Sequence, residues 1–204
     1  MGLYSQFIFP RLCEWALNTE PVAKHRQALL SQAEGNILEI GFGTGLNLPH
    51  YPDRVRRLTV VDPNRGMHRL AQKRIKQRGF EIDHRLLSSE QLPFESGVFD
   101  CVVSTFTLCS IEDVNRAIGE VYRVLRPGGK FLFLEHGLSP EPKVQRWQRR
   151  LNWLQKRIGD GCRLDRNIKE LITAQAFSSV AMDECSLEKA PKTHGYLYKG
   201  AATR

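Results

Sequence analysis

The chain has 204 residues, of which 41% are hydrophobic and 25% charged, and its formal net charge is +8. This composition is typical of one globular domain and excludes a disordered chain, a fibrous repeat and a multi-span membrane protein. The N-terminal residues lack the charged start and apolar core of a secretory signal. The five cysteines are widely spaced without a Cys-x-x-Cys pair. This pattern predicts neither a disulfide framework nor a metal site, and it fits a reducing cytoplasm.

The sequence of the first two thirds of the chain predicts an N-terminal helical segment, followed by most of the strands of a sheet. Residues 1–34 are predicted as an N-terminal helical cap, with an apolar patch that includes Phe7 and Trp15. Strand-like and helix-like segments then alternate. Strands are predicted at 36–40, 58–61, 80–87, 99–104 and 130–135, with helices at 64–78 and 114–125. This alternation indicates an α/β fold, a parallel sheet with helices on both faces.

Turn signals mark the ends of these helices. Gly79 suits the end of the first helix, and Pro127-Gly128-Gly129 ends the second. Ser110-x-x-Asp113 resembles a capping box at the start of the second helix.

The last third, residues 138–204, has a different pattern. Apolar residues recur at spacings of 3 and 4 between Val144 and Ile158, which predicts a lid helix. A second helix is predicted over 165–176. Two strand-like runs at 180–187 and 195–201 are predicted to form an antiparallel hairpin at one sheet edge. Because there is no repeat and no linker, we expect a single domain over residues 1–204.

Basic residues gather in two stretches. Residues 54–78 carry nine Lys and Arg against Asp62 alone, and residues 143–157 carry six and no acid. Such clusters attract anionic partners, namely nucleic acid, acidic lipid headgroups or an acidic protein. The alternative is that each cluster is simply the solvated face of a helix.

The stretch from Leu38 to Gly45 reads Leu-Glu-Ile-Gly-Phe-Gly-Thr-Gly, a strand that runs into a glycine-rich turn. Glycines permit positive φ and let a ligand approach the backbone closely. The N–H groups that follow favour an anion such as a carboxylate. Asp62 stands 21 residues after Gly41, at the end of the second strand, where a carboxylate accepts both hydroxyls of a ribose. Together these features indicate an adenosine-containing ligand.

The glycine spacing distinguishes between ligands. Dinucleotide-binding turns prefer G-x-G-x-x-G, whereas here the third glycine follows the second after one residue, and Leu46 occupies the position that would hold the dinucleotide pattern's last glycine. A phosphate-binding P-loop would need Gly-Lys-Ser/Thr, which the chain lacks. An acidic residue two positions before glycines at every second position is typical of S-adenosylmethionine (AdoMet) binding.

With these motifs the chain resembles the class I AdoMet-dependent methyltransferases of the small-molecule type. The resemblance is carried by residues 39–45, 61–64, 89–94, 99–103 and 123–129. A narrower one, to alkyl thiol methyltransferases and more loosely to bacterial phosphatidylethanolamine N-methyltransferases, is carried by residues 104–110, 133–136 and 160–164. The family implies a Rossmann-like seven-stranded sheet of order 3-2-1-4-5-7-6 with the last strand antiparallel. It also implies that residues 35–137 form the AdoMet-binding half.

The resemblance also assigns roles to single residues. The glycines of the turn would line the methionine moiety, and Glu39 before them would orient the loop or the amino group. Residues that follow the second, third and fourth strands would hold the rest of the cofactor. These cofactor-binding residues are Glu39, Gly41, Gly43, Gly45, Asp62, Asn64, Met67, Ser89, Glu90 and Thr105. Within this set, Asp62 would hold the ribose hydroxyls and Thr105 would lie near the sulfonium.

Methyl transfer from a sulfonium mainly requires that the acceptor be aligned, shielded from water and deprotonated. A thiol acceptor with a pKa of about 8.5 needs only modest help to ionise. His136, just past the fifth strand, is the candidate catalytic base or hydrogen-bond partner. Its alternative role is a loop cap that bonds to the backbone.

The acceptor pocket is predicted from aromatic and apolar residues. Tyr4, Phe7, Trp147 and Trp153 are expected to wall it, with Cys109 as a small packing residue beside it. The basic helix over 143–157 is also a candidate for peripheral contact with an anionic membrane.

The function that best fits these observations is methyl transfer from AdoMet to a small apolar thiol. Alternatives are a phospholipid N-methyltransferase, a nicotinamide-dependent dehydrogenase and a non-catalytic AdoMet-binding module. Nucleic acid is disfavoured as a substrate because Asn/Asp-Pro-Pro-Tyr/Phe is absent after the fourth strand, where Ser104-Thr105-Phe106-Thr107 stands.

Overall fold

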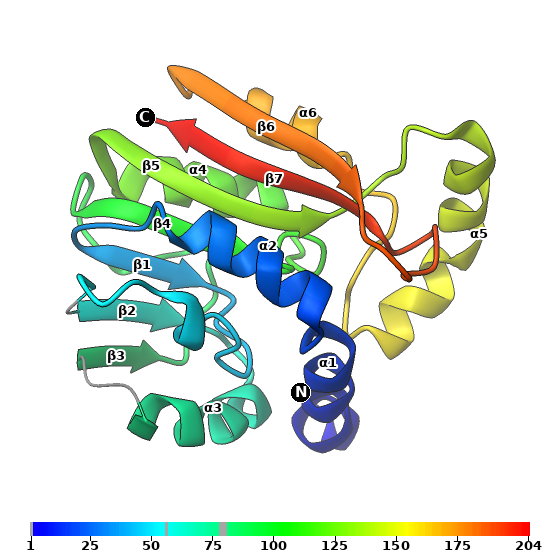
Figure 1. The fold of residues 1–204 in the computed structure, drawn as a ribbon, viewed down its shortest axis with the longest axis horizontal. Coiled ribbons are helices and arrows are strands. Elements are labelled where there is room, and N and C mark those ends of the chain that lie inside the picture. The colour runs from blue at the N-terminus through cyan, green and yellow to red at the C-terminus, as the bar shows by residue number, and fades with distance from the viewer. Residues whose placement is uncertain (1, 56, 78–80) are drawn as a thin grey trace.

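A seven-stranded sheet runs through the middle of the molecule in the computed structural model, which describes residues 2–55, 57–77 and 81–204 (Figure 1). The strand order is β3-β2-β1-β4-β5-β7-β6, as predicted. The strands are β1 (Ile37–Ile40), β2 (Arg57–Val61), β3 (Glu81–Arg85), β4 (Phe99–Thr105), β5 (Leu125–His136), β6 (Ser179–Ser186) and β7 (Tyr196–Thr203). The first five are parallel, and β7 is antiparallel to both β5 and β6.

The central strands form because both of their faces are covered. All four residues of β1 are buried, and in β4 six of seven are, so these segments are nearly continuous apolar runs. In register, Ile40 pairs with Val61 on one side and Ser104 on the other. The parallel strands therefore deliver the glycine turn and the residue after Val61 to the same edge of the sheet.

Helices bury their apolar faces on both sides of this sheet. On one side lie α2 (Glu20–Leu30) and α3 (Arg65–Gln77), whose Leu29, Leu30 and Ala71 join a core with β1 and β2. On the other side lie α4 (Val114–Val124) and α6 (Ile168–Thr173), which share a second core with β4 and β5. Figure 1 shows α2 in front of the sheet and α4 behind it. The predicted two-faced arrangement is confirmed.

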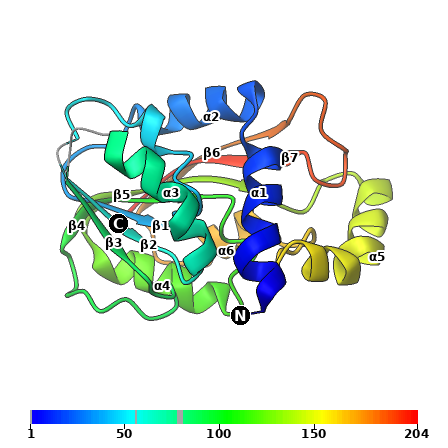
Figure 2. The same cartoon turned by 90° about the horizontal axis from the view of Figure 1, so that it is seen from below.

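The N-terminal segment closes over the carboxyl ends of the strands. It comprises a π-helical turn at Tyr4–Ile8 and α1 (Phe9–Leu17), which Figures 1 and 2 both place beyond the ends of β1 and β2. A Cβ at Gly66, in the first turn of α3, would overlap the carbonyl oxygen of Gln6. Only glycine therefore permits this close approach, and the segment forms a lid over the strand ends.

Several predicted boundaries need correction. Asp113 is itself the N-cap of α4 and accepts a hydrogen bond from the Arg116 N–H at 3.0 Å, so the predicted capping box does not form. The helix predicted at 165–176 is shorter because the Asn167 side chain caps it and accepts from Glu170 N–H. Strand β5 begins at Leu125, directly after α4. Residues 78–80, which include the predicted C-terminal glycine of α3, lie outside the described residues.

The predicted lid helix is α5 (Pro142–Ile158), which lies beyond the end of β5. Among the described residues, no helix combines the length and apolar character needed to cross a bilayer.

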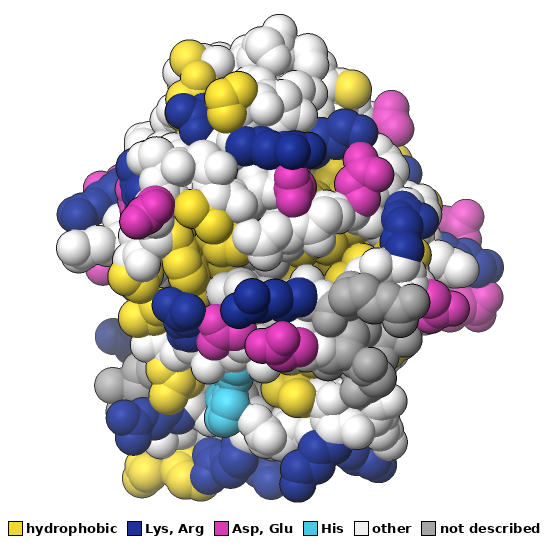
Figure 3. Space-filling view, turned by 90° about the vertical axis from the view of Figure 1, so that its left-hand side faces the viewer, with side chains coloured by type: hydrophobic (Ala, Val, Ile, Leu, Met, Phe, Trp, Pro, Cys, Tyr) yellow, Lys and Arg dark blue, Asp and Glu magenta, His cyan; other side chains and the backbone are white. Residues whose placement is uncertain are grey.

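Two of the basic residues described within the 54–78 stretch lie next to acidic side chains. Figure 3, which views the amino ends of the strands, shows Lys and Arg side chains interspersed with Asp and Glu. Arg57 lies 3.9 Å from Glu81, and Arg74 forms an ion pair with Glu14.

Candidate active site

A cavity of about 270 Å³ lies at the carboxyl edge of the sheet, between the glycine turn and the N-terminal helices. Loops after β1, β2, β3 and β4 contribute to its walls, and α1 and α2 close it from the outside. This is the position at which parallel α/β sheets bind ligands, because the strand order reverses between β1 and β4.

The glycine turn has the backbone that its sequence predicts. Gly41, Gly43 and Gly45 have φ values of 66°, 56° and 78°. A Cβ at Gly41 would overlap the Thr107 side chain, whereas Gly43 has only open space beside it. Gly41 and Gly43 line the cavity, but Gly45 does not, because it packs against Phe42 and other apolar side chains below the turn. Gly45 therefore shapes the turn without reaching a ligand.

Asp62 lies at the cavity wall with its carboxylate fixed by two backbone donors. The oxygens accept from Gly43 N at 2.8 Å and from Asn64 N at 2.7 Å. Burial raises the pKa of Asp62, and these two hydrogen bonds partly offset that rise. Each oxygen keeps a second lone pair, so this group can accept from a pair of vicinal hydroxyls.

Glu39 is buried below the cavity and does not line it. Its carboxylate accepts from the Tyr51 hydroxyl at 2.6 Å and from Asn47 Nδ2 at 3.0 Å. Burial raises the pKa of Glu39 to about 7. Asn47 does line the cavity. Glu39 is therefore connected to the cavity through its hydrogen bond with Asn47, and its two predicted roles stay predictions.

The other predicted cofactor residues are brought together around the cavity. Asn64, Met67, Ser89, Glu90 and Thr105 all line it. Asn64 also connects the site to its lid, because its Nδ2 donates to the carbonyl of Ser5 at 2.9 Å while its Oδ1 accepts from Gly66 N at 2.8 Å.

No motif in the sequence points to Arg26, which reaches the cavity from α2. The residue is only 4% exposed, and its Nη1 donates to Asn47 Oδ1 at 2.6 Å and to Thr105 Oγ1 at 2.7 Å. Within the described part of the chain, Nε of this guanidinium has no hydrogen-bond partner. Burial lowers the pKa of Arg26 to about 10, so the group remains a cation at neutral pH. A buried cation with an unused donor on a cavity wall is suited to a carboxylate.

The residues predicted to wall the acceptor pocket lie elsewhere. Tyr4, Phe7, Trp147 and Trp153 are all outside the cavity lining, and so is Cys109, which was predicted only to pack beside the pocket. The Tyr4 hydroxyl donates to Ile158 O at 2.5 Å, the Phe7 ring lies against the Arg69 guanidinium, and Trp147 is 57% exposed. Apolar walls are instead supplied by Phe9, Cys13, Leu17, Leu46 and Ile111. The apolar wall is thus formed in part by α1, whereas the predicted residues lie in the turn before α1, in the turn after β4 and on α5.

Comparison with known proteins places this fold and site in a family. Residues 38–133 match the family model described as a methyltransferase domain. The chain is 35% identical over 156 residues to thiol S-methyltransferase TMT1B of Rattus norvegicus, covering 74% of this chain and 63% of that protein. It is 31% identical over 174 residues to human thiol S-methyltransferase TMT1A, covering 80% and 70%. The chain is a class I AdoMet-dependent methyltransferase.

Two further comparisons agree with this assignment. The methyltransferase is 28% identical over 144 residues to a phosphatidylethanolamine N-methyltransferase of Cereibacter sphaeroides, covering 66% of this chain and 70% of that protein. It shares its fold with a crystallised methyltransferase from Thermotoga maritima, with a TM-score of 0.67, 19% identity and coverage of 98% and 97%. AdoMet is accordingly its cofactor. The chain spans 63% of the rat relative's length, slightly under two thirds.

His136, the predicted catalytic residue, is 8% exposed and does not line the cavity of the methyltransferase. Its Nε2 lies 3.2 Å from Cys162 Sγ, and its ring stacks against Phe106, which does line the cavity. Burial alone would lower the pKa of His136, but the neighbouring Cys162 outweighs this effect and the net pKa is raised. The predicted alternative of a backbone cap receives no support, because no hydrogen bond from the ring to a backbone group is found in the described chain.

Proposed function

We propose that this methyltransferase transfers the methyl group of AdoMet to the sulfur of a small apolar thiol. The observation that carries the proposal is the identity of 35% and 31% to two thiol S-methyltransferases over most of the chain. The apolar wall formed by α1 and by Leu46 and Ile111 supports it, because an alkyl or aryl thiol gains affinity from such surfaces.

The residues of the cavity fit AdoMet at three points. The Arg26 guanidinium on the cavity wall pairs with the methionine carboxylate, and Asp62 accepts from the ribose hydroxyls. Asn64 and Met67 flank the position for the adenine. When bound there, AdoMet supplies an electrophilic methyl group on a sulfonium sulfur. The protein's own contribution is to place the acceptor in line with that methyl and to exclude water from the site. Phe9 and Phe106, which both line the cavity, exclude water.

A labelled-methyl assay tests this proposal. The purified chain is incubated with AdoMet carrying a labelled methyl group and with an alkyl thiol, a matched alcohol, a matched amine and phosphatidylethanolamine vesicles. We expect label in the thioether only. Binding of AdoMet without transfer to any thiol would overturn the proposal, and transfer to the lipid amine would favour the phospholipid alternative that the Cereibacter relative suggests.

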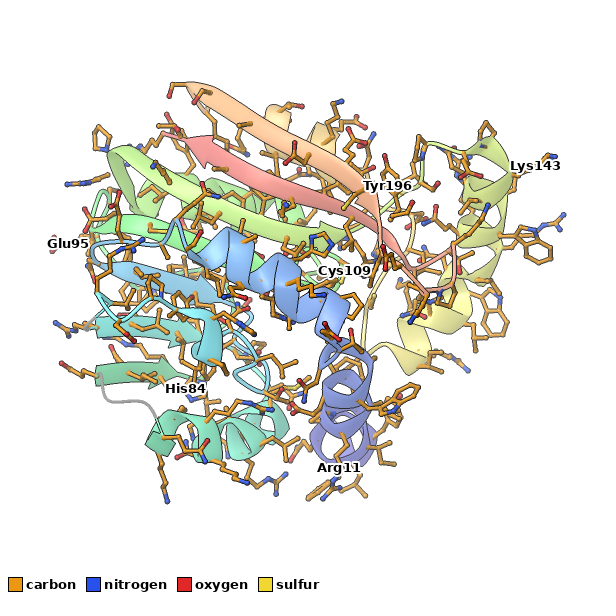
Figure 4. The ribbon with its side chains drawn as sticks, viewed as in Figure 1. Arg11, His84, Glu95, Cys109, Lys143 and Tyr196 are labelled. Carbon is orange, nitrogen blue, oxygen red and sulfur yellow. The ribbon has the colours of Figure 1, made fainter. Side chains whose placement is uncertain are left out.

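We also propose that the enzyme meets an anionic membrane through α1 and α5. Trp15, Trp147 and Trp153 are 80%, 57% and 66% exposed, and the basic residues of 143–157 lie on the same helix as two of them. Figure 4 shows Lys143 pointing away from the body of the protein. The Tyr4–Ile158 hydrogen bond joins the turn before α1 to the end of α5. Exposed indole rings among cations are suited to a bilayer interface.

Vesicle sedimentation tests the membrane contact. We expect the protein to sediment with vesicles that contain anionic lipid and to stay in solution with neutral ones. Substituting both Trp147 and Trp153 with Ser should abolish sedimentation. The control is Val98→Ser, which changes an exposed apolar residue just before β4 and should leave sedimentation as it is. Equal sedimentation of the double variant and the parent protein would contradict the proposed surface.

A further inference from the structure

The three segments of the narrower resemblance meet at one point of the structure. Residues 104–110 end and follow β4, residues 133–136 end β5, and residues 160–164 follow α5. Each contributes one side chain to a cluster, namely buried Cys109, buried His136 and partly buried Cys162. Figure 4 shows Cys109 at the carboxyl edge of the sheet. Long stretches of sequence separate these residues, so no local motif predicts the cluster.

The donor atoms of the cluster are close enough to share a ligand. The two sulfurs and the imidazole nitrogen lie within 4.8 Å of one another, and His136 Nε2 is 3.2 Å from Cys162 Sγ. Tetrahedral Zn²⁺ lies roughly 2.0–2.3 Å from nitrogen and sulfur ligands, which places neighbouring ligands about 3.5 Å apart. Only small side-chain movements separate the observed cluster from that arrangement.

The backbone holds the two cysteine-bearing turns against each other. Arg163 N donates to Cys109 O at 3.0 Å, so the turn after α5 is bonded to the turn after β4. Each turn contains a non-glycine residue with positive φ, Phe106 at 53° and Asp160 at 49°. Such conformations cost free energy and persist where the surrounding structure requires them. The backbone of the two turns therefore holds Cys109 and Cys162 close together.

We propose that Cys109, His136 and Cys162 bind a thiophilic divalent cation, with Zn²⁺ as the best fit to the donors. Two thiolates and an imidazole select a soft or borderline ion, and no carboxylate is among the donors to favour Mg²⁺ or Ca²⁺. Three protein ligands leave a fourth tetrahedral position open, as in catalytic zinc sites and unlike closed structural ones.

The cluster lies next to residues that line the cofactor cavity. Phe106 and Ser110, on either side of Cys109, line that cavity, as does Asp160 two residues before Cys162. If the proposed thiol specificity holds, the fourth position takes the acceptor sulfur. The S–H proton passes to water, and the new S–CH₃ bond forms as the CH₃–S⁺ bond breaks, with its electron pair going to the departing sulfide. This second step rests on the proposed function, whereas metal binding itself does not.

Metal binding is tested on the whole chain without AdoMet or thiol. The protein is reduced with a non-chelating phosphine, stripped of metal and titrated with Co²⁺, whose absorption reports tetrahedral thiolate ligands, and then with Zn²⁺ against a chromogenic chelator. We expect one ion per chain. Cys109→Ser and Cys162→Ser should each weaken Zn²⁺ binding at least tenfold. The control is Cys185→Ser on β6, a thiol of the same partial burial as Cys162, which should leave it unchanged.

The outcomes separate this inference from the proposed function. AdoMet affinity checks the fold of both cluster variants, because neither cysteine lines the cavity. A folded, reduced protein that takes up no Co²⁺ or Zn²⁺ overturns the metal site, as would equal loss of affinity in the Cys185 control. If metal binds but stripped and reloaded enzyme methylate a thiol at the same rate, the open-position step is wrong and the site is structural.

Discussion

Substitution of Arg26 gives the most specific test of how the cofactor is held. Its Nη1 is engaged by Asn47 and Thr105, its Nε–H is buried without a partner in the described chain, and its side chain lines the cavity. A hydrogen bond between charged groups contributes about 1.5–3 kcal/mol, and a 1.4 kcal/mol loss is tenfold in affinity. Arg26→Met should therefore weaken binding of the demethylated product, S-adenosylhomocysteine, by roughly 10- to 150-fold.

The assay compares two ligands that differ at the end where Arg26 lies. 5′-Methylthioadenosine keeps the adenosine and sulfur of the product and lacks its amino-acid carboxylate, so its affinity, measured by calorimetry, should change by no more than about twofold. Lys24→Met, an exposed residue of the same helix, is the control and should affect neither ligand. Equal weakening of both ligands would mean that Arg26 acts only by positioning Asn47 and Thr105. No weakening of either would refute the carboxylate assignment.

Three further substitutions test other parts of the site. Asp62→Asn should weaken AdoMet at least tenfold in calorimetry, about 1.4 kcal/mol, and unchanged affinity would refute the ribose role. Gly66→Ala should displace the residue 2–17 segment, because its Cβ would overlap Gln6 O; faster amide exchange confined to that segment is expected, and unaltered exchange would contradict the close approach. Burial raises the pKa of Glu39 from 4.5 to about 7. Between those pH values the unfolded chain releases a proton that the folded chain keeps, so stability falls as pH rises, by up to about 3 kcal/mol for this group. The free energy of unfolding, measured by urea at pH 5 and pH 8, should therefore fall less with pH in Glu39→Gln than in the parent protein. An equal fall in both proteins would contradict the raised pKa of Glu39.

The positions of the strands and the cofactor turn were predictable because their signals are local, whereas the order of the strands came from the family resemblance. β1 and β4 are continuous buried runs, and the glycine turn and Asp62 each sit directly at a strand end, so the parallel topology alone brings them together. The same reasoning places Asn64 and Thr105 at the cavity. These residues needed no knowledge of how distant helices pack.

The acceptor side was less predictable because it depends on which face of each N-terminal helix turns inward. Helical periodicity gives the spacing of apolar residues, and α1 carries them on more than one side. Leu12 and Trp15 face solvent, while Phe9 and Cys13 face the cavity. Hydrophobicity does not distinguish an inward face from one suited to a membrane, which is why Phe7 was assigned to the wrong side.

The two ends of the cavity are therefore assembled in different ways. The cofactor end is built from short segments that follow consecutive strands, to which α2 adds Arg26. The other end joins α1, the turn after β4 and the turn after α5, which meet only in the folded chain. A shared fold can keep the first end while the second changes its chemistry, since function resides in the site and not in the architecture. Cofactor affinity in the Arg26 and Asp62 variants reports on the first end alone. Metal affinity in the Cys109 and Cys162 variants reports on the second, so an error in either assignment leaves the other measurable.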